Sequence, residues 1–174
     1  MAKGNGSTGR IAKLEDELCD ILLQLVSVDI DRNISTGACN ITVLGQANYL
    51  NEKMREHEIG CYICRKCEIL ERYCFIAWDK EDLQKALVYA EEKLSLAQAH
   101  SEHSELTLSN SLYYCGCLKA ATGKRKEGID LIQKAVAIDT RLYGEMYPVT
   151  FARRSKLQSL LNWEEVDFQR RYTA

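Results

Sequence analysis

The chain has 174 residues, the size of one domain, and this length buries about two-thirds of the unfolded surface. Its formal net charge of −2 gives no general attraction to nucleic acid or anionic lipid, so neither partner is expected. No apolar run approaches a membrane span, and residues 1–7 lack the apolar core of a signal peptide. The eight cysteines are therefore expected to be reduced, in the cytoplasm or the nucleus.

The N-terminal part predicts one long amphipathic helix after a short disordered segment. Residues 1–10 are rich in Gly and Ser and are expected to be disordered. Residues 11–28 repeat apolar side chains at helical spacing. The apolar face consists of Ile11, Leu14, Leu18, Ile21, Leu22 and Leu25, and Val26 and Val28 widen it. So wide a face needs neighbours on two sides or a partner chain, which makes self-association through 11–28 one expectation.

A loop and a second helix are predicted next. Residues 29–40 are dominated by loop-forming types, and Asn40 is a plausible cap for a helix that runs to about residue 59. The inward side chains of that helix are Val43, Leu44, Ala47, Leu50 and Met54. Gly60 is expected to mark a joint before the third helix.

The helix predicted over 61–78 carries a cysteine pattern with two interpretations. Cys61, Cys64 and Cys67 have the spacing of a metal or redox site, with His57 nearby. On a helix, however, these cysteines share the apolar face with Cys74, and the set spreads over roughly 20 Å. One zinc ion could then bind only a neighbouring pair. Buried reduced thiols are therefore favoured and no metal ligand is assigned, while a zinc-binding or redox protein is kept as an alternative.

The rest of the chain predicts four more helices. Asp79 is expected to cap a helix with an apolar stripe from Leu83 to Ala97. The segment 109–150 predicts two helices joined by a short turn at Gly123, which must pack antiparallel. Pro148 is a good first residue for a closing helix over 148–174. Its polar side carries Arg153 and Arg154, which suit solvated surface or contact with an acidic partner.

The small residues of 109–150 resemble those of a tetratricopeptide repeat. Gly116, Gly123, Gly128 and Ala135 occupy the small, turn, small and alanine positions. The exit over 142–149 resembles the kinesin-light-chain style of the repeat, with Tyr147 where that style has His, and is similar to the C-terminal helical domain of SET-and-MYND methyltransferases.

The helical periodicity of every apolar segment predicts an all-α fold with about seven helices. The resemblance implies that these helices stack as antiparallel pairs in a short superhelix. One domain is expected over 11–174, with a degenerate repeat at 67–107, the clearest repeat at 109–150 and a capping helix at 148–174. Terminal repeats need such a cap to cover the open end of the stack.

A non-catalytic adaptor or scaffold is the function that the resemblance implies. Paired catalytic carboxylates, an activated nucleophile and a phosphate loop are not recognisable, so neither an enzyme nor a cofactor is expected. The inner face of the repeat would carry Tyr113, Cys117 and Ala120, without the basic residues of a carboxylate clamp. Such an apolar groove suits a helix or a short extended peptide of a partner protein. The alternative is that Tyr113 and Cys117 pack against the neighbouring helix.

Two further functions are kept open. The chain could be the accessory C-terminal part of a SET-and-MYND-type methyltransferase or a relative, without that family's cofactor or zinc-cluster sequence. It could instead be a zinc-binding or redox protein, which the zinc content of protein purified without added metal would distinguish.

Overall fold

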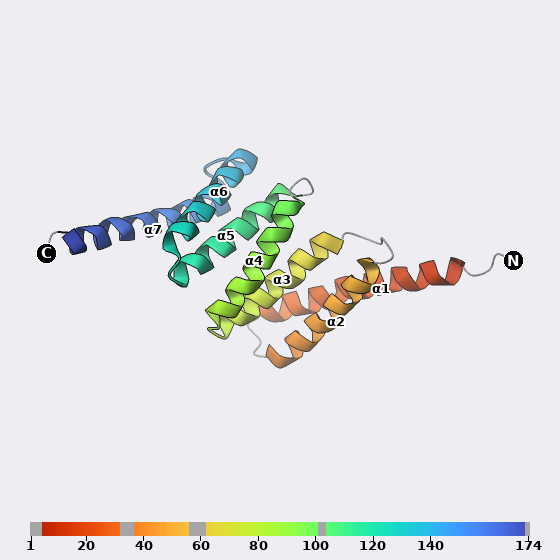
Figure 1. The fold of residues 1–174 in the computed structure, drawn as a ribbon. Coiled ribbons are helices and arrows are strands. Elements are labelled where there is room, and N and C mark those ends of the chain that lie inside the picture. Colours follow the sequence, from red (N-terminus) through yellow and green to blue (C-terminus); the bar gives the residue numbers. More distant parts are fainter. Residues whose placement is uncertain (1–4, 32–36, 56–61, 101–103, 173–174) are drawn as a thin grey trace. The chain divides into compact units, whose positions relative to one another are not determined.

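The computed structural model describes residues 5–31, 37–55, 62–100 and 104–172, and leaves out the side chains of 163–172 and of some other positions. This part of the chain contains helices and no strand (Figure 1). The helices are α1 (Asn5–Asp31), α2 (Gly37–Arg55), α3 (Tyr62–Asp79), α4 (Leu83–Ala99), α5 (Glu105–Ala121), α6 (Arg125–Tyr143) and α7 (Pro148–Tyr172). The prediction of an all-α fold with about seven helices is confirmed. None of the described helices is long and apolar enough to cross a membrane.

The chain divides into two compact units, Met1–Asp82 and Leu83–Ala174. The N-terminal unit contains α1 to α3, and the C-terminal unit contains α4 to α7. The boundary falls inside the predicted repeat 67–107. The pairing of α3 with α4 as a repeat, and the single domain over 11–174, therefore stay predictions.

The N-terminal unit has its own apolar core between three helices. The buried side chains are Cys19, Leu23 and Val26 of α1, Leu44 and Ala47 of α2, and Ile69 and Ile76 of α3. Ion pairs also link these helices. Arg65 of α3 lies 2.6 Å from Asp16 and 2.8 Å from Asp20 of α1. The predicted inward residues Val43, Leu44, Ala47 and Leu50 belong to or border this core.

Several element ends differ from the sequence predictions. Helix α1 begins at Asn5 and therefore includes Gly6 and Gly9, although glycine disfavours a helix. Asn40 lies inside the first turn of α2 and is not its cap. Asp79 ends α3, and Asp82 immediately precedes α4. Gly60 lies outside the described residues.

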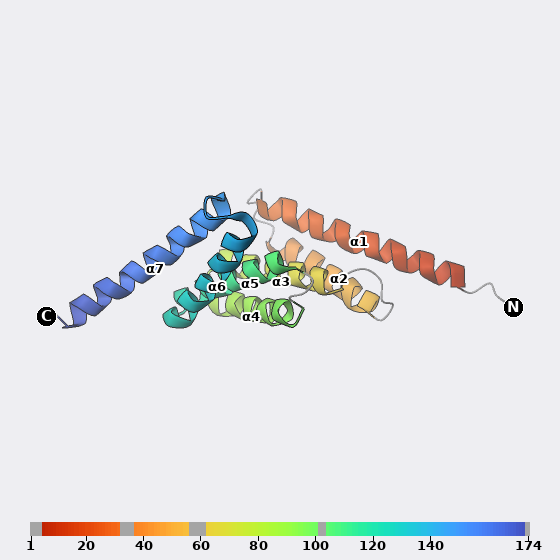
Figure 2. The ribbon, with the colours of Figure 1, turned by 90° about the horizontal axis from the view of Figure 1, so that it is seen from above.

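The C-terminal unit is a run of adjacent helices in which α5 lies between α4 and α6 (Figure 1; Figure 2 shows the same helices from above). Helices α5 and α6 approach most closely where Gly116 faces Gly128. A Cβ atom added to Gly128 would stand 2.5 Å from the carbonyl oxygen of Gly116. The prediction that Gly128 permits a close crossing is confirmed. The predicted turn is also confirmed, because Gly123 has a φ of 91°, which L side chains rarely adopt.

Candidate functional site: a groove between α4 and α6

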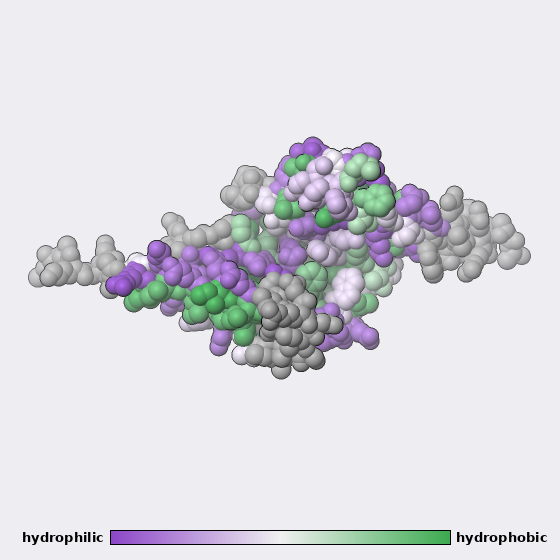
Figure 3. Space-filling view, turned by 180° about the vertical axis from the view of Figure 1, so that it is seen from behind, coloured by the Kyte–Doolittle hydropathy of each residue, from purple (hydrophilic) through white to green (hydrophobic). Residues whose placement is uncertain are grey.

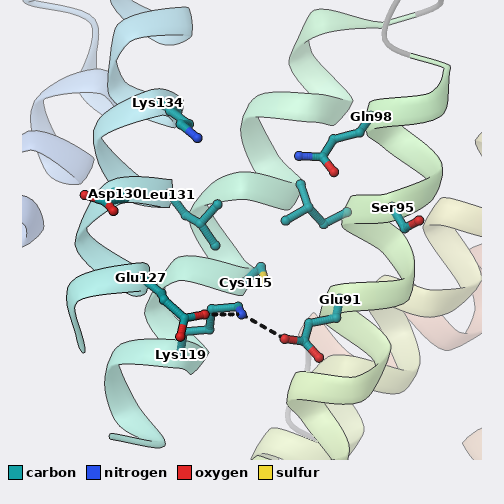
Figure 4. Close-up of a pocket in the computed structure, with 10 residues that line it drawn as sticks. Glu91, Ser95, Gln98, Cys115, Lys119, Glu127, Asp130, Leu131 and Lys134 are labelled. Carbon is teal, nitrogen blue, oxygen red and sulfur yellow. Dashed lines mark hydrogen bonds and ion pairs between the residues drawn. The ribbon is translucent and has the colours of Figure 1, made fainter. Parts of the chain in front are cut away.

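A groove of about 420 Å³ lies between α4 and α6, and α5 forms its floor (Figure 4). All three helices belong to the C-terminal unit. The lining residues are Glu91, Leu94, Ser95 and Gln98 of α4, Cys115 and Lys119 of α5, and Glu127, Asp130, Leu131 and Lys134 of α6. A volume of this size is typical of a site for a small ligand or a few side chains of a partner.

Lys119 connects the three helices at one end of the groove. Its ammonium nitrogen lies 2.8 Å from Glu127 and 3.0 Å from Glu91 (Figure 4). The hydrogen bonds to Glu127 and Glu91 raise the pKa of Lys119. Both glutamates are exposed, so water screens the pairs and their contribution to stability is small. The two ion pairs link α5 to α4 and to α6 at this end of the groove.

The floor of the groove is apolar. The Cys115 side chain is fully buried, Leu94 is nearly buried, and Leu131 is half-buried. Burial raises the pKa of the Cys115 thiol to about 11. The thiol is therefore neutral near pH 7 and contributes apolar surface, because a nucleophilic cysteine needs its thiolate form.

Polar side chains surround the other end. Ser95 and Gln98 are exposed on α4, and Asp130 and Lys134 are exposed on α6. Asp130 and Lys134 form no ion pair with the residues that the structure describes. These four side chains are free to hydrogen-bond a bound segment above the apolar floor.

Stability is expected to fall between about pH 9 and about pH 11, partly because of Cys115. Burial raises its pKa from the ordinary 9.0 to about 11 in the folded chain. The unfolded chain therefore loses this proton first, so the contribution is present below pH 9 and is lost as pH rises through the folded pKa. Urea unfolding at about pH 8 and about pH 10.5 measures the loss. The loss should be smaller in Cys115→Ala, and equal losses in both proteins would contradict the assignment.

The predicted groove residues lie on a different side of α5. Tyr113 and Cys117 are half-buried, and the Tyr113 hydroxyl donates a hydrogen bond to the Cys117 sulfur. The guanidinium of Arg153, on α7, stands 4.6 Å from the centre of the Tyr113 ring. Ala120 belongs to the α5–α6 crossing, beside Gly128. These contacts favour the packing alternative, and partner binding by the three residues stays a prediction.

Arg153 was expected on the polar side of the closing helix, and the structure corrects this placement. The residue is 6% exposed, and one guanidinium nitrogen lies 2.7 Å from Asp139 of α6 and 3.0 Å from Ser109 of α5. The other nitrogen donates to Asn110. Helical periodicity cannot reveal that α5 and α6 lie against this side of α7. Arg154 is partly exposed, as expected, and pairs with Glu145 at 3.1 Å.

The cysteines of α3 divide into two kinds. Cys67 and Cys74 are buried and reduced, as predicted. Cys64 is exposed and disulfide-bonded, so the prediction of reduced cysteines is wrong at this position. His57 and Cys61 lie outside the described residues. Within the described ranges, no group of three His, Cys, Asp or Glu side chains could hold a metal ion.

Sequence reasoning missed the groove, although one signal was present. Lys119 is the only basic residue in α5, within an otherwise uncharged run from Leu106 to Ala121. An isolated charge in a packed helix requires a partner. The partners, Glu91 and Glu127, belong to two other helices, and no spacing along the chain relates them.

Comparison of the chain with protein-family models, curated proteins and solved structures finds no match. The likeness to a tetratricopeptide repeat therefore depends on the sequence pattern. The structure supports the class, an all-α protein, and supplies the groove as a candidate site.

Proposed function

We propose that the C-terminal unit, Leu83–Ala174, binds a short segment of a partner protein in the α4–α6 groove and acts as a non-catalytic adaptor. The supporting observation is the groove itself, with an apolar floor, polar side chains on both rims and an ion-pair connection at one end. We place this adaptor in the cytoplasm or the nucleus, because five described cysteines, Cys19, Cys67, Cys74, Cys115 and Cys117, are reduced, although Cys64 is disulfide-bonded.

The size of the groove favours an extended segment over a whole helix. A volume of about 420 Å³ accommodates a few side chains. One apolar side chain of the partner would lie on Leu94, Cys115 and Leu131. The backbone of the segment would then pass between the two rims, within reach of Ser95 and Gln98 on one side and of Lys134 on the other.

The charge of the rims predicts weak dependence on salt. Glu91 and Glu127 are already paired with Lys119, and Asp130 and Lys134 have opposite charges. A bound segment would neutralise little net charge. Added salt should therefore change its affinity only slightly, since salt screens mainly exposed charge–charge attraction.

Replacement of Leu131 by arginine tests the proposal. Peptides are first selected from a random library on the immobilised full chain, and their affinities are measured by fluorescence anisotropy. Leu131→Arg places a charge over the apolar floor and is expected to cost about 2 kcal/mol, or about thirtyfold in affinity. Met146→Arg is the matched control, because Met146 is 86% exposed in the loop before α7 and away from the groove.

Three results distinguish the possibilities. Loss of affinity in Leu131→Arg with an unchanged melting temperature supports the groove. Unchanged affinity in this variant, with loss in Tyr113→Ala, would move the binding site to the side of α5 that faces α7. Failure to select any peptide that competes for one site would contradict the adaptor proposal.

A further inference from the structure

Helix α1 has two separate apolar faces. One is buried in the N-terminal unit through Cys19, Leu23 and Val26. The other is a stripe that remains between 46% and 57% exposed, and it consists of Ile11, Leu14, Leu18, Ile21 and Leu25. Figure 3 shows a hydrophobic (green) row along α1, next to a hydrophilic (purple) row. The core of the unit therefore leaves this second face uncovered.

The spacing of the stripe is that of a helix–helix seam. Its members follow one another at intervals of three, four, three and four residues, which is the a/d pattern of a coiled coil. The stripe runs for roughly 21 Å, because a helix rises about 1.5 Å per residue. Long branched side chains at these positions insert between those of a second helix with the same period. The occupant that fits such a face is accordingly another amphipathic helix.

The charged residues of α1 indicate which helix packs on this stripe. Glu15 is paired with Lys53, and Asp16 and Asp20 are paired with Arg65, so these acids are occupied within the unit. The basic residues of α1, Arg10 and Lys13, are exposed near its start, and Glu17, one turn further along, is an exposed acid.

The last turn of α1 has the opposite charge. It contains Asp29 and Asp31 and no basic residue. Two α1 helices in antiparallel orientation would bring the basic part of each copy to the acidic end of the other. The same orientation aligns the helix dipoles favourably.

We propose that α1 pairs with α1 of a second copy of this chain, as an antiparallel two-stranded coiled coil. In the register that places Arg10 near the last turn of the second copy, Leu14 lies opposite Leu25 and Leu18 lies opposite Ile21. The interface is symmetric, so each contact occurs twice. Because α1 already packs against α2 and α3 within the unit, forming the dimer does not require the entropy cost of folding this helix.

Sedimentation equilibrium of the full chain, with reducing agent present, tests the proposal. Wild-type protein is expected to be a dimer at about 100 µM. Leu18→Glu introduces a charge into the centre of the stripe in both copies and should weaken the dimer by about a hundredfold. Val88→Glu is the matched control, because Val88 is 60% exposed on α4 and should leave the dimer intact. If Leu18→Glu changes the helix content, Leu14→Glu, at another exposed position of the stripe, is used in its place.

The charged residues test the orientation. Arg10→Glu combined with Lys13→Glu would place like charges at both ends of an antiparallel pair and should weaken it several-fold. No effect of the double variant would contradict the antiparallel arrangement. A wild-type chain that stays monomeric at this concentration would overturn the proposal, as would a dimer that tolerates glutamate at both Leu14 and Leu18.

Discussion

Replacement of Asp139 by alanine is expected to destabilise the C-terminal unit by about 3–5 kcal/mol, because it leaves a buried guanidinium without its anion. Arg153 lies 2.7 Å from Asp139, and the two side chains are 7% and 1% exposed. Ser109 and Asn110 would remain as partners, but neither carries a compensating charge. Urea unfolding of the full chain measures the loss.

Two further variants sharpen this prediction. Arg154→Ala removes the partly exposed pair with Glu145 and should cost about 0–1 kcal/mol. Asp139→Ala combined with Arg153→Met should recover much of the loss, because neither charge then remains buried. If Asp139→Ala cost no more than Arg154→Ala, Arg153 would have to be solvated, and the burial described here would be wrong.

Gly128→Leu is expected to lower the stability of the same unit by about 3 kcal/mol, near the upper end of the usual cost of overpacking. A Cβ atom at this position would stand 2.5 Å from the Gly116 carbonyl oxygen and 2.8 Å from the Ala120 amide nitrogen. Both are backbone atoms, so rotation of a side chain cannot relieve the clash. Thermal unfolding followed by circular dichroism should show a clear decrease in melting temperature.

Gly45→Leu is the matched control for this variant. Gly45 also lies inside a helix, but among the described residues the only atom near a Cβ added there is the Tyr73 hydroxyl oxygen, at 4.0 Å. Leucine favours the helix over glycine by up to about 1 kcal/mol, so the control should melt at the wild-type temperature or slightly above it. Equal melting temperatures for Gly128→Leu and wild type would mean that α5 and α6 do not cross at this point.

The order of the helices was largely predictable from the sequence. Apolar residues repeat at helical spacing along 11–28, and the helix that contains them is α1. The helix predicted over 61–78 is observed as Tyr62–Asp79. The ends were less predictable. Asp79 and Asp82 are both good capping residues, and only the turn between α3 and α4 decides that Asp82 precedes the helix.

The candidate site was predictable only in part. The sequence identified α5 and α6 as a close pair and Gly128 as the reason. It did not identify which side of α5 would be open, because helical periodicity distinguishes the faces of one helix and not the neighbours that cover them. Tyr113 lies under Arg153 for this reason, while Cys115 and Lys119 line the groove.

The sequence by itself determined the all-α class, the number and order of the helices, and the glycines of the α5–α6 crossing and turn. These features are local, because they depend on the period of the side chains and on the space that a single residue occupies. The tertiary structure alone decided the burial of Arg153, the connection of Glu91 and Glu127 through Lys119, and the exposure of Leu18 on α1. Each of these depends on helices that meet in space although their residues are distant in the chain.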